Sequence, residues 1–454
     1  MTKKYLIETF GCQMNVHDSE RMAGLLERAG YARADSDTDA DVIVINTCSV
    51  REHAEDKLYT RLGQLRMLEE ASQHAPTVVV AGCVAQQEGA ALLHKTNGHV
   101  IDVILGTQRQ KLLPMLTAAA ATATEAVVDT APLDDVSFPL GAVRRDDPVR
   151  AYVSIIEGCN DFCAFCVVPY TRGHERMRSK VEILAEVRDA VASGRREVQL
   201  LGQIVNHYQA PDDPRCDFAA LLEAVHEIDG VDRIRFASPH PRHTSARLID
   251  TIAALPKVCK HVHLPVQSGS TRVLAAMRRR HSREEYLDLV ARIRETIPGV
   301  TLSTDMIVGF PGETAADFED TLSLTEEAQF LSMFSFKYSP RPNTLASKRL
   351  PDDVDDREKT ARIVALQALQ RRIQTQHHEA MVGRPFTVLV DSVSRRRDGE
   401  WSGRTEGNVV VNFPPLPDAS RPVALGQTVT VDIQRAGPHS VWGVARATRS
   451  EAPC

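Results

Sequence analysis

The sequence predicts an α/β protein in three parts: an N-terminal parallel α/β sheet domain, a central incomplete (β/α)6 barrel and a small C-terminal all-β barrel. Three observations support this prediction. Apolar, β-rich runs alternate with helical periodicity before residue 117, the alternation resumes in six units after residue 150, and short strands with turn signals follow Arg384. Strands that alternate with helices are typical of parallel sheets covered by helices.

Composition sets the broad class of the chain. The 454 residues are 43% hydrophobic and 25% charged, which provides apolar sequence for several cores and excludes global disorder. The net charge of -6 gives no whole-chain electrostatic case for nucleic-acid binding, so such a contact needs local basic patches. No apolar run approaches the ~20 residues of a membrane span, and the first residues lack a signal-peptide core. We therefore expect a cytoplasmic protein that makes no membrane contact, with reduced cysteines rather than a disulfide framework.

In the N-terminal part, a cysteine follows each of three strand-like runs within two residues. The runs are 5–10, 42–46 and 77–82, a fourth lies at 101–105, and helical segments are expected near 17–29, 50–69 and 85–95. The cysteines are Cys12, Cys48 and Cys83. Because the carboxyl ends of parallel strands share one edge of a sheet, this topology brings three distant thiols to one place. Scattered cysteines can also be buried apolar residues without a chemical role.

The central part has six candidate strands with helices between them. The strands are expected at 151–157, 197–202, 233–238, 261–265, 301–309 and 331–338, and the helices at 180–193, 217–228, 244–254, 283–296 and 314–328. Six units are two short of a closed barrel, which leaves a lateral opening wide enough for a bulky substrate. A charged helical connector is expected near 355–381. We divide the chain into an N-terminal domain (1–117), a linker (118–148), a barrel (149–378) and a C-terminal domain (379–448).

Three cysteines follow the first barrel strand in a C-x3-C-x2-C pattern: Cys159, Cys163 and Cys166. Three thiolates from one loop can hold three irons of a 4Fe–4S cube and leave the fourth iron open to a small ligand. A zinc site without its fourth ligand and three buried structural thiols are the alternatives.

This loop, with the aromatic Phe165 before its last cysteine, resembles the radical S-adenosylmethionine superfamily. The resemblance implies that Cys159, Cys163 and Cys166 ligate a 4Fe–4S cluster whose open iron chelates S-adenosylmethionine, and that cleavage of the sulfonium bond yields a 5′-deoxyadenosyl radical. It also implies that the backbone at Phe165 faces the adenine. Gln203 stands where the superfamily has an acidic residue, which leaves the cofactor role of that position open. The segment 305–314, DMIVGFPGET, resembles a glycine-containing motif of the adenosine pocket, or is an ordinary turn.

Further motifs narrow the resemblance to the methylthiotransferase branch of that superfamily. They are GCQMN, CSVREHAEDK, GCVAQQEG, HLPVQSGS and SFKYSPRP, and together with the cysteine loop they cover nearly the whole chain. The branch implies a second 4Fe–4S cluster on Cys12, Cys48 and Cys83 that holds or supplies sulfur, and a tRNA-binding TRAM domain at the C-terminus. The implied reaction methylthiolates carbon 2 of N6-isopentenyladenosine at tRNA position 37, with S-adenosylmethionine as both radical source and methyl donor.

The same resemblance implies the partners. They are a tRNA anticodon stem-loop that carries isopentenyladenosine, a reducing system such as flavodoxin and an unknown sulfur donor; we expect a monomer. Alternative functions are methylthiolation of threonylcarbamoyladenosine in tRNA or of a ribosomal-protein aspartate. A non-catalytic iron–sulfur regulator that binds RNA is a third.

Several other residues leave two interpretations open. The arginine run 395–397 and Trp401 fit either RNA contacts or a solvated turn beside a core tryptophan, and the basic run 277–281 fits an anticodon-stem contact or a solvated helix end. Four histidines near strand ends suggest a mononuclear metal site or, more simply, hydrogen-bonded barrel residues: His240, His243, His261 and His263. No role is assigned to Cys216, Cys259 or Cys454.

Overall fold

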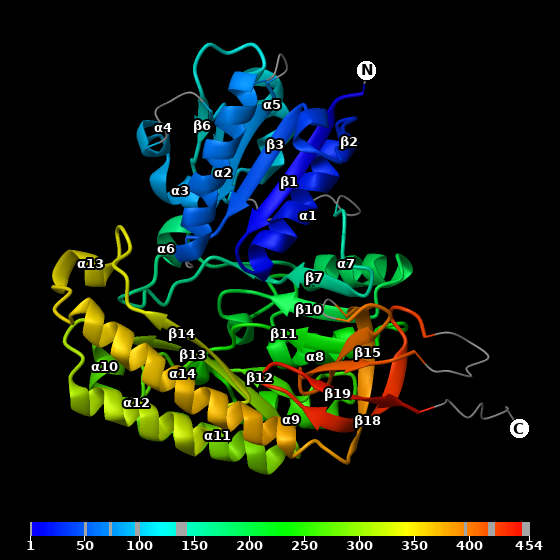
Figure 1. Cartoon of the computed structure of the whole chain (residues 1–454), viewed down its shortest axis with the longest axis vertical. Coiled ribbons are helices and arrows are strands. Elements are labelled where there is room, and N and C mark those ends of the chain that lie inside the picture. The colour runs from blue at the N-terminus through cyan, green and yellow to red at the C-terminus, as the bar shows by residue number, and fades with distance from the viewer. Residues whose placement is uncertain are drawn as a thin grey trace, which may run out of the picture.

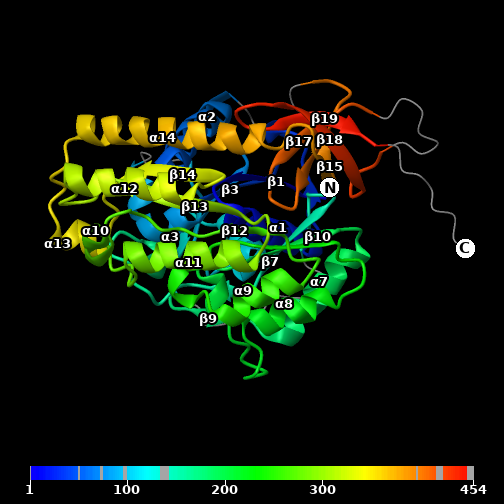
Figure 2. The ribbon, with the colours of Figure 1, turned by 90° about the horizontal axis from the view of Figure 1, so that it is seen from below.

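The structure is a computed structural model, and it describes residues 2–49, 52–71, 75–95, 100–132, 143–394, 397–415 and 423–446. The N-terminal domain lies against one end of the central barrel, and the C-terminal β-barrel lies against its side (Figure 1). A view turned by 90° shows the helices α11, α12 and α14 running side by side along the outside of the central domain (Figure 2). The predicted α/β class and its three parts are confirmed.

The N-terminal domain is a single parallel sheet with helices on both faces. Its strands are β1 (Lys4–Phe10), β2 (Ala32–Arg33), β3 (Val42–Thr47), β4 (Thr77–Gly82), β5 (Val103–Leu105) and β6 (Val127–Asp129), in the order β2-β1-β3-β4-β5-β6. Its helices are α1 (Gln13–Arg28), α2 (Glu52–Ala71), α3 (Cys83–Glu88), α4 (Ala91–Lys95) and α5 (Leu113–Ala120). Side chains of β3 alternate between the two faces, so Val42 and Val44 pack with α1 and α5, while Ile43 and Ile45 pack with α2.

Strand β6 lies inside the range 118–148 that the composition indicated as a linker. It pairs with β5 through Val103–Val127, Ile104–Val128 and Leu105–Asp129, and it forms one edge of the sheet. Part of the expected linker therefore belongs to the N-terminal sheet. Residues 133–142 lie outside the described residues.

The central domain has the six predicted strand–helix units. Its strands are β7 (Arg150–Ser154), β10 (Glu197–Leu201), β11 (Arg233–Phe236), β12 (His261–His263), β13 (Thr301–Val308) and β14 (Ser332–Lys337). They form two three-stranded parallel sheets, and Ile234 joins these sheets because its N–H donates to Lys257 (2.7 Å) and its carbonyl accepts from Cys259 (3.0 Å). The strands β7 and β14 are the two ends of this open arc.

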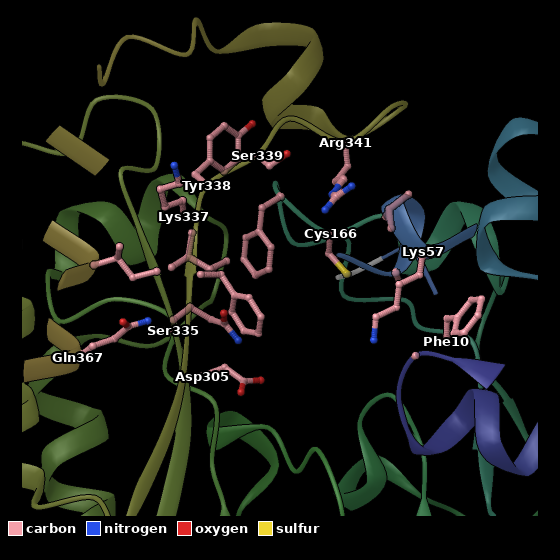
Figure 3. A pocket seen from close by; sticks show the side chains of 18 of the residues that line it. Phe10, Lys57, Cys166, Asp305, Ser335, Lys337, Tyr338, Ser339, Arg341 and Gln367 are labelled. Carbon is pink, nitrogen blue, oxygen red and sulfur yellow. Dashed lines mark hydrogen bonds between the residues drawn. The ribbon is translucent and has the colours of Figure 1, made fainter. Parts of the chain in front are cut away.

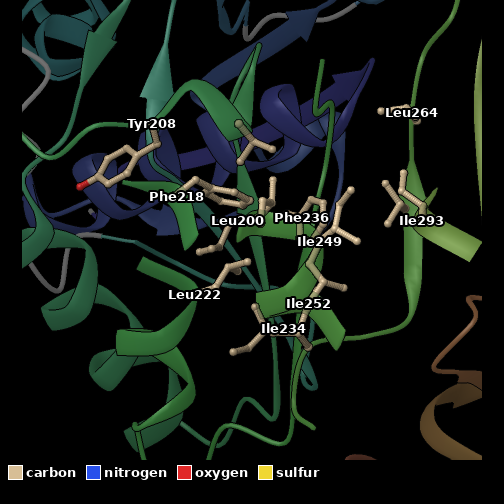
Figure 4. Close-up of a cluster of buried hydrophobic side chains, with 14 of the residues drawn as sticks. Leu200, Tyr208, Phe218, Leu222, Ile234, Phe236, Ile249, Ile252, Leu264 and Ile293 are labelled. Carbon is tan, nitrogen blue, oxygen red and sulfur yellow. The ribbon is translucent and has the colours of Figure 1, made fainter. Parts of the chain in front are cut away.

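The helices of the central domain are α6 (Val168–Thr171), α7 (Lys180–Ala192), α8 (Phe218–His226), α9 (Ala246–Ala254), α10 (Thr271–Ala276), α11 (Arg283–Thr296), α12 (Ala315–Ala328), α13 (Leu345–Arg349) and α14 (Asp356–Glu379). The longer ones bury their apolar faces against the arc. Leu200, Phe218, Phe236 and Ile249 are part of the resulting core (Figure 4). The predicted first strand is shorter than expected, because a separate antiparallel pair, β8 (Ile156–Glu157) and β9 (Arg176–Met177), follows β7.

The C-terminal domain is a closed five-stranded barrel, as predicted. Its strands are β15 (Pro385–Val393), β16 (Trp401–Thr405), β17 (Val410–Phe413), β18 (Thr428–Ala436) and β19 (Val441–Ala445), in the order β15-β16-β17-β19-β18. Arg235 holds it on the central domain by donating to the Thr405 carbonyl at 2.8 Å. Within the described residues, every helix is too short or too polar to cross a membrane.

Candidate functional site

The N-terminal sheet brings Cys12, Cys48 and Cys83 to one edge. Strand β3 lies between β1 and β4, with Thr47 paired to Phe10 on one side and to Gly82 on the other. Each cysteine follows its strand by one or two residues, and the Cys48 N–H donates to the Phe10 carbonyl at 2.9 Å. Three thiols that are far apart in sequence thus occupy the carboxyl ends of three adjacent strands.

Two glycines allow these strand ends to approach closely. A Cβ on Gly11 would lie 2.7 Å from the Cys48 Cβ, and a Cβ on Gly82 would lie 2.6 Å from the Thr47 carbonyl oxygen. Gly82 also has a φ of +94°, which residues with a side chain rarely adopt. The glycines of the GCQMN and AGC motifs are therefore required by the packing around the thiols.

The electrostatic surroundings of this edge favour an anionic sulfur at Cys12. A hydrogen bond with Cys48 and the positive charge of Arg172 lower the pKa of the Cys12 thiol to about 6, against the effect of burial. Burial raises the pKa of Cys83, and the Arg172 guanidinium acts in the opposite direction through its charge and a hydrogen bond. Arg172 comes from the central domain and forms a buried ion pair with Asp18 of α1 (Nη2–Oδ2 2.7 Å).

The second cysteine trio lies on a loop that backbone hydrogen bonds hold at several points. The Cys159 N–H donates to the Gly173 carbonyl (3.2 Å), the Ala164 N–H to Met277 (2.9 Å) and the Cys166 N–H to Cys163 (3.0 Å). Burial raises the pKa of the Cys159 and Cys166 thiols to about 12. Since thiolates are the metal-binding form, these two ligands need a positively charged group to be deprotonated at neutral pH.

A cavity of about 780 Å³ opens between the two cysteine-bearing domains. The N-terminal domain lines it with Thr9, Phe10, Gly11, Ala54 and Lys57, and the central domain with residues that include Phe165, Cys166, Asp305, Lys337 and Arg341. Lys57 and Phe10 lie across this space from Asp305, and Cys166 lies between them (Figure 3). The loop after β1 that carries Cys12 and the loop after β8 that carries Cys166 therefore border one chamber.

Gln203 and the segment 305–314, which were compared with cofactor-site positions of the superfamily, both have features of a ligand site. Gln203 has a buried Oε1 that accepts no hydrogen bond from the described residues. Asp305 and Ile307 of the segment 305–314 line the cavity. The same segment also ends in a turn, because Gly309 and Gly312 have φ values of +70° and +78°.

The histidines do not form a mononuclear metal site. His261 and His263 each place Nδ1 against a neighbouring hydroxyl, Thr301 Oγ1 at 2.9 Å and Ser303 Oγ at 2.8 Å. In the part of the chain that the structure describes, no three His, Cys, Asp or Glu side chains converge on one metal position. A 4Fe–4S cube binds each cysteine through a different iron, so its ligands need no such convergence.

Only part of the basic run 277–281 lies on the surface. Arg278 and Arg280 are exposed, but Arg279 is 7% exposed and its Nη1 donates to the Cys163 sulfur at 3.6 Å. Trp401 is half-buried and packs against the core of the C-terminal barrel. Arg395, Arg396 and Cys454 lie outside the described residues.

Sequence reasoning missed the charged residues that join the domains at this site. Arg172 with Asp18, Arg21 with Glu157 (2.8 Å) and Arg341 with Glu55 (3.1 Å) are ion pairs between the N-terminal and central domains. No periodicity marks these residues. Glu55 lies in the CSVREHAEDK motif, Arg341 lies in SFKYSPRP, and Arg172 follows the last cysteine of the loop by six residues, so their positions in or near the motifs were the available signal.

Comparisons with known proteins agree with this architecture. Profiles of three families match: Uncharacterized protein family UPF0004 at residues 4–106, the radical SAM superfamily at 153–325 and the TRAM domain at 379–445. The tRNA-2-methylthio-N(6)-dimethylallyladenosine synthase of Geobacter metallireducens is 44% identical over 446 residues, covering 97% of this chain and 98% of that protein. The synthase of Burkholderia vietnamiensis is 44% identical over 449 residues, with 98% and 97% coverage. The chain belongs to this synthase family.

The family confirms the resemblance carried by the cysteine motifs, and makes the chain an enzyme of the radical S-adenosylmethionine superfamily. Among solved structures, the radical S-adenosylmethionine methyltransferase TsrM of Kitasatospora setae, with cobalamin and a [4Fe-4S] cluster bound, has a TM-score of 0.56 at 14% identity. The match covers 76% of this chain and 74% of that one. At this identity the likeness concerns the fold alone.

Proposed function

We propose that this chain methylthiolates carbon 2 of N6-isopentenyladenosine at position 37 of tRNA. The observation that carries the proposal is the chamber of about 780 Å³ that the loop of Cys166 and the sheet edge of Cys12 share. The carbon–hydrogen bond at this position is neither acidic nor electrophilic, so general acid–base catalysis is poorly suited to it. A site with one thiol trio for radical generation and another for sulfur supply meets this requirement.

Each trio has the donor set of a 4Fe–4S cluster with one open iron. Cys159, Cys163 and Cys166 hold the cluster that binds S-adenosylmethionine, and Cys12, Cys48 and Cys83 hold the second cluster. When bound, these groups supply the radical that removes the hydrogen, the sulfur that replaces it and the methyl group that completes the product. The buried Gln203 Oε1, which accepts no hydrogen bond from the described residues, would be available to accept one from bound S-adenosylmethionine.

The protein's own side chains orient the target nucleoside and exclude water. Phe10 and Phe165 provide apolar surface for the adenine and its isopentenyl group, and they come from opposite domains. Lys57 places positive charge at the chamber, where the phosphates of an anticodon loop would lie. The C-terminal barrel, on the flank of the central domain, binds the tRNA body.

The remaining parts of the proposal concern organisation and partners. The functional units are residues 1–117, 149–378 and 379–448, and the segment 118–148 connects the first two. A reducing system such as flavodoxin delivers electrons to the barrel cluster. The chain acts in the cytoplasm. It acts as a monomer, because one chain contains both trios and the chamber between them.

Nucleoside analysis of tRNA from a strain that lacks the gene tests the reaction. We expect loss of the methylthio nucleoside and accumulation of isopentenyladenosine, both reversed by the wild-type gene. Loss of methylthiolated threonylcarbamoyladenosine, or of the modified ribosomal-protein aspartate, would instead support the other branches. Unchanged nucleosides, together with no S-adenosylmethionine cleavage by the reduced protein, would support the regulator.

Iron analysis tests the cofactor assignment independently of activity. The reconstituted protein should contain about eight irons, because each trio holds one four-iron cluster. The triple variant Cys12→Ala, Cys48→Ala, Cys83→Ala should retain about four irons, and Mössbauer spectra should show that these form a single cubane. An iron content that the triple substitution leaves unaltered would contradict the second site.

A further inference from the structure

Two buried arginines of the central domain lie next to the cysteine trios, one beside each. Arg172 directly follows α6 and is 5% exposed, while Arg279 lies between α10 and α11 and is 7% exposed. Neither lies between the cysteines of the C-x3-C-x2-C pattern. Because a buried guanidinium is costly without an anionic or hydrogen-bonding partner, the partners of each arginine indicate what it serves.

Arg172 reaches across the domain boundary to the N-terminal trio. Its guanidinium forms the ion pair with Asp18 at 2.7 Å, and its carbonyl accepts from Gln108 Nε2 at 2.8 Å, so both ends of the residue are held by the N-terminal domain. Helix α6, which ends just before Arg172, packs on α3, which begins at Cys83. The positive charge of Arg172 favours the anionic forms of Cys83 and Cys12. Asp18 thus holds the Arg172 guanidinium beside the N-terminal trio.

Arg279 has a different and less complete set of partners. Nη2 donates to the Pro265 carbonyl at 2.8 Å and Nη1 to the Cys163 sulfur at 3.6 Å, while the buried Nε has no hydrogen-bond partner among the described residues. No described carboxylate lies within ion-pair distance of this guanidinium, whereas the neighbouring Arg280 approaches Asp161 (3.9 Å). A buried cation without a counter-ion, next to a cysteine loop, calls for an anionic group at that loop.

A thiolate-ligated 4Fe–4S cluster is such a group. Hydrogen bonds to the ligand sulfurs and nearby charge are among the factors that set the reduction potential of iron–sulfur clusters. A positive charge stabilises the reduced state more than the oxidised state, since the reduced cluster carries one more negative charge. Removing the charge should therefore lower the potential of the adjacent cluster.

We propose that Arg172 and Arg279 are positioning residues that each stabilise one cluster, Arg172 the N-terminal cluster and Arg279 the barrel cluster, and that each raises the reduction potential of its own cluster. This inference rests on the proposed cluster ligands. It adds a cross-domain dependence: the N-terminal cluster receives its arginine from the barrel domain, so its potential depends on the docking of the two domains.

Redox titrations of the reconstituted full-length protein, followed by electron paramagnetic resonance, test the proposal. Triple cysteine-to-alanine backgrounds that retain one trio assign each signal to its cluster. Arg279→Gln should decrease the equilibrium constant for reduction of the barrel cluster at least tenfold, which is about 59 mV for a one-electron couple, and leave the N-terminal cluster unchanged. Arg172→Gln should have the converse effect. Arg172→Lys and Arg279→Lys keep the charge and should recover part of each shift.

Arg278→Gln is the matched control, because it removes an exposed arginine beside Arg279 and should alter neither potential. Unchanged potentials in both glutamine variants, or equal shifts of both clusters in each, would overturn the inference. If a glutamine variant loads fewer irons, restored loading in its lysine counterpart supports the role, and unrestored loading overturns it in favour of a packing role. A wild-type protein that holds one cluster would instead refute the proposed function.

Discussion

The close contact of Gly11 with the N-terminal trio allows a sharp test of the site. In Gly11→Ala the new methyl group would lie 2.7 Å from the Cys48 Cβ and 2.6 Å from Asn15 Oδ1. Neither neighbour can retreat easily, because the Cys48 N–H is bound to the Phe10 carbonyl and the Asn15 amide donates to Asn46 Oδ1 at 3.2 Å. Overpacking of this kind costs about 1–3 kcal/mol, and it displaces a thiol that we assign to the cluster.

Gly63 provides the matched control in the same domain. It lies exposed in the middle of α2, and a Cβ there would meet no atom within 4 Å. Gly63→Ala should therefore stabilise the domain by about 0.5–1 kcal/mol, because alanine loses less conformational freedom in a helix than glycine does. The two glycine-to-alanine changes are thus expected to have opposite signs.

Hydrogen exchange of the amides in β1 and β3, measured on the metal-free protein, reports this difference. Tryptophan fluorescence does not serve, because both tryptophans, Trp401 and Trp442, lie in the C-terminal barrel. Gly11→Ala should exchange faster than wild type and reconstitute with about four irons, while Gly63→Ala should exchange more slowly and keep about eight. Wild-type exchange and iron content in Gly11→Ala would refute the packing argument.

Three further predictions concern the cysteines and two buried carboxylates. The Cys48→Ala variant should cleave S-adenosylmethionine but form no methylthio product, whereas the Cys163→Ala variant should form no 5′-deoxyadenosine. Chromatographic measurement of 5′-deoxyadenosine and of the methylthio nucleoside separates these outcomes. A normal methylthio yield from Cys48→Ala would contradict the assignment of Cys48 as a cluster ligand. Although burial raises it, two neighbouring arginines hold the pKa of Glu197 at about 2, so its carboxylate stabilises the fold above about pH 4.5 and this contribution is lost as the pH falls through 2. Glu197→Gln should lower the free energy of unfolding at pH 7 by about 3 kcal/mol in denaturant titrations, and a change below about 1 kcal/mol would show that the arginines find other partners. Burial raises the pKa of Glu20 to about 8, so the folded chain retains a proton that the unfolded chain loses, and stability falls as the pH rises from about 4.5 to 8. Glu20→Gln should flatten this decline and melt at a higher temperature than wild type at pH 8; parallel melting profiles of the two proteins would count against the assignment.

Elements with a strong local signature were predictable. The six barrel strands and the connector helix α14 lie within a few residues of their expected positions, because each combines apolar periodicity with a clear boundary. Strand β6 was missed since it is three residues long and lies in an Ala- and Asp-rich segment, so only its pairing with β5 identifies it. For Arg279 the sequence suggested a position that the structure does not have. Its place in a basic run indicated a surface contact, whereas the structure buries it against Cys163.

The spacing of the cysteines and their position after strands are local properties, so the pattern alone was enough to predict two thiol trios and the three-part fold. The shared chamber and the arginine beside each trio depend on how separate units dock. Asp18 and Arg172 are 154 residues apart, and their contact follows from the angle at which the N-terminal sheet meets the barrel. Side-chain packing between the folded domains sets that angle, and no single stretch of sequence determines it.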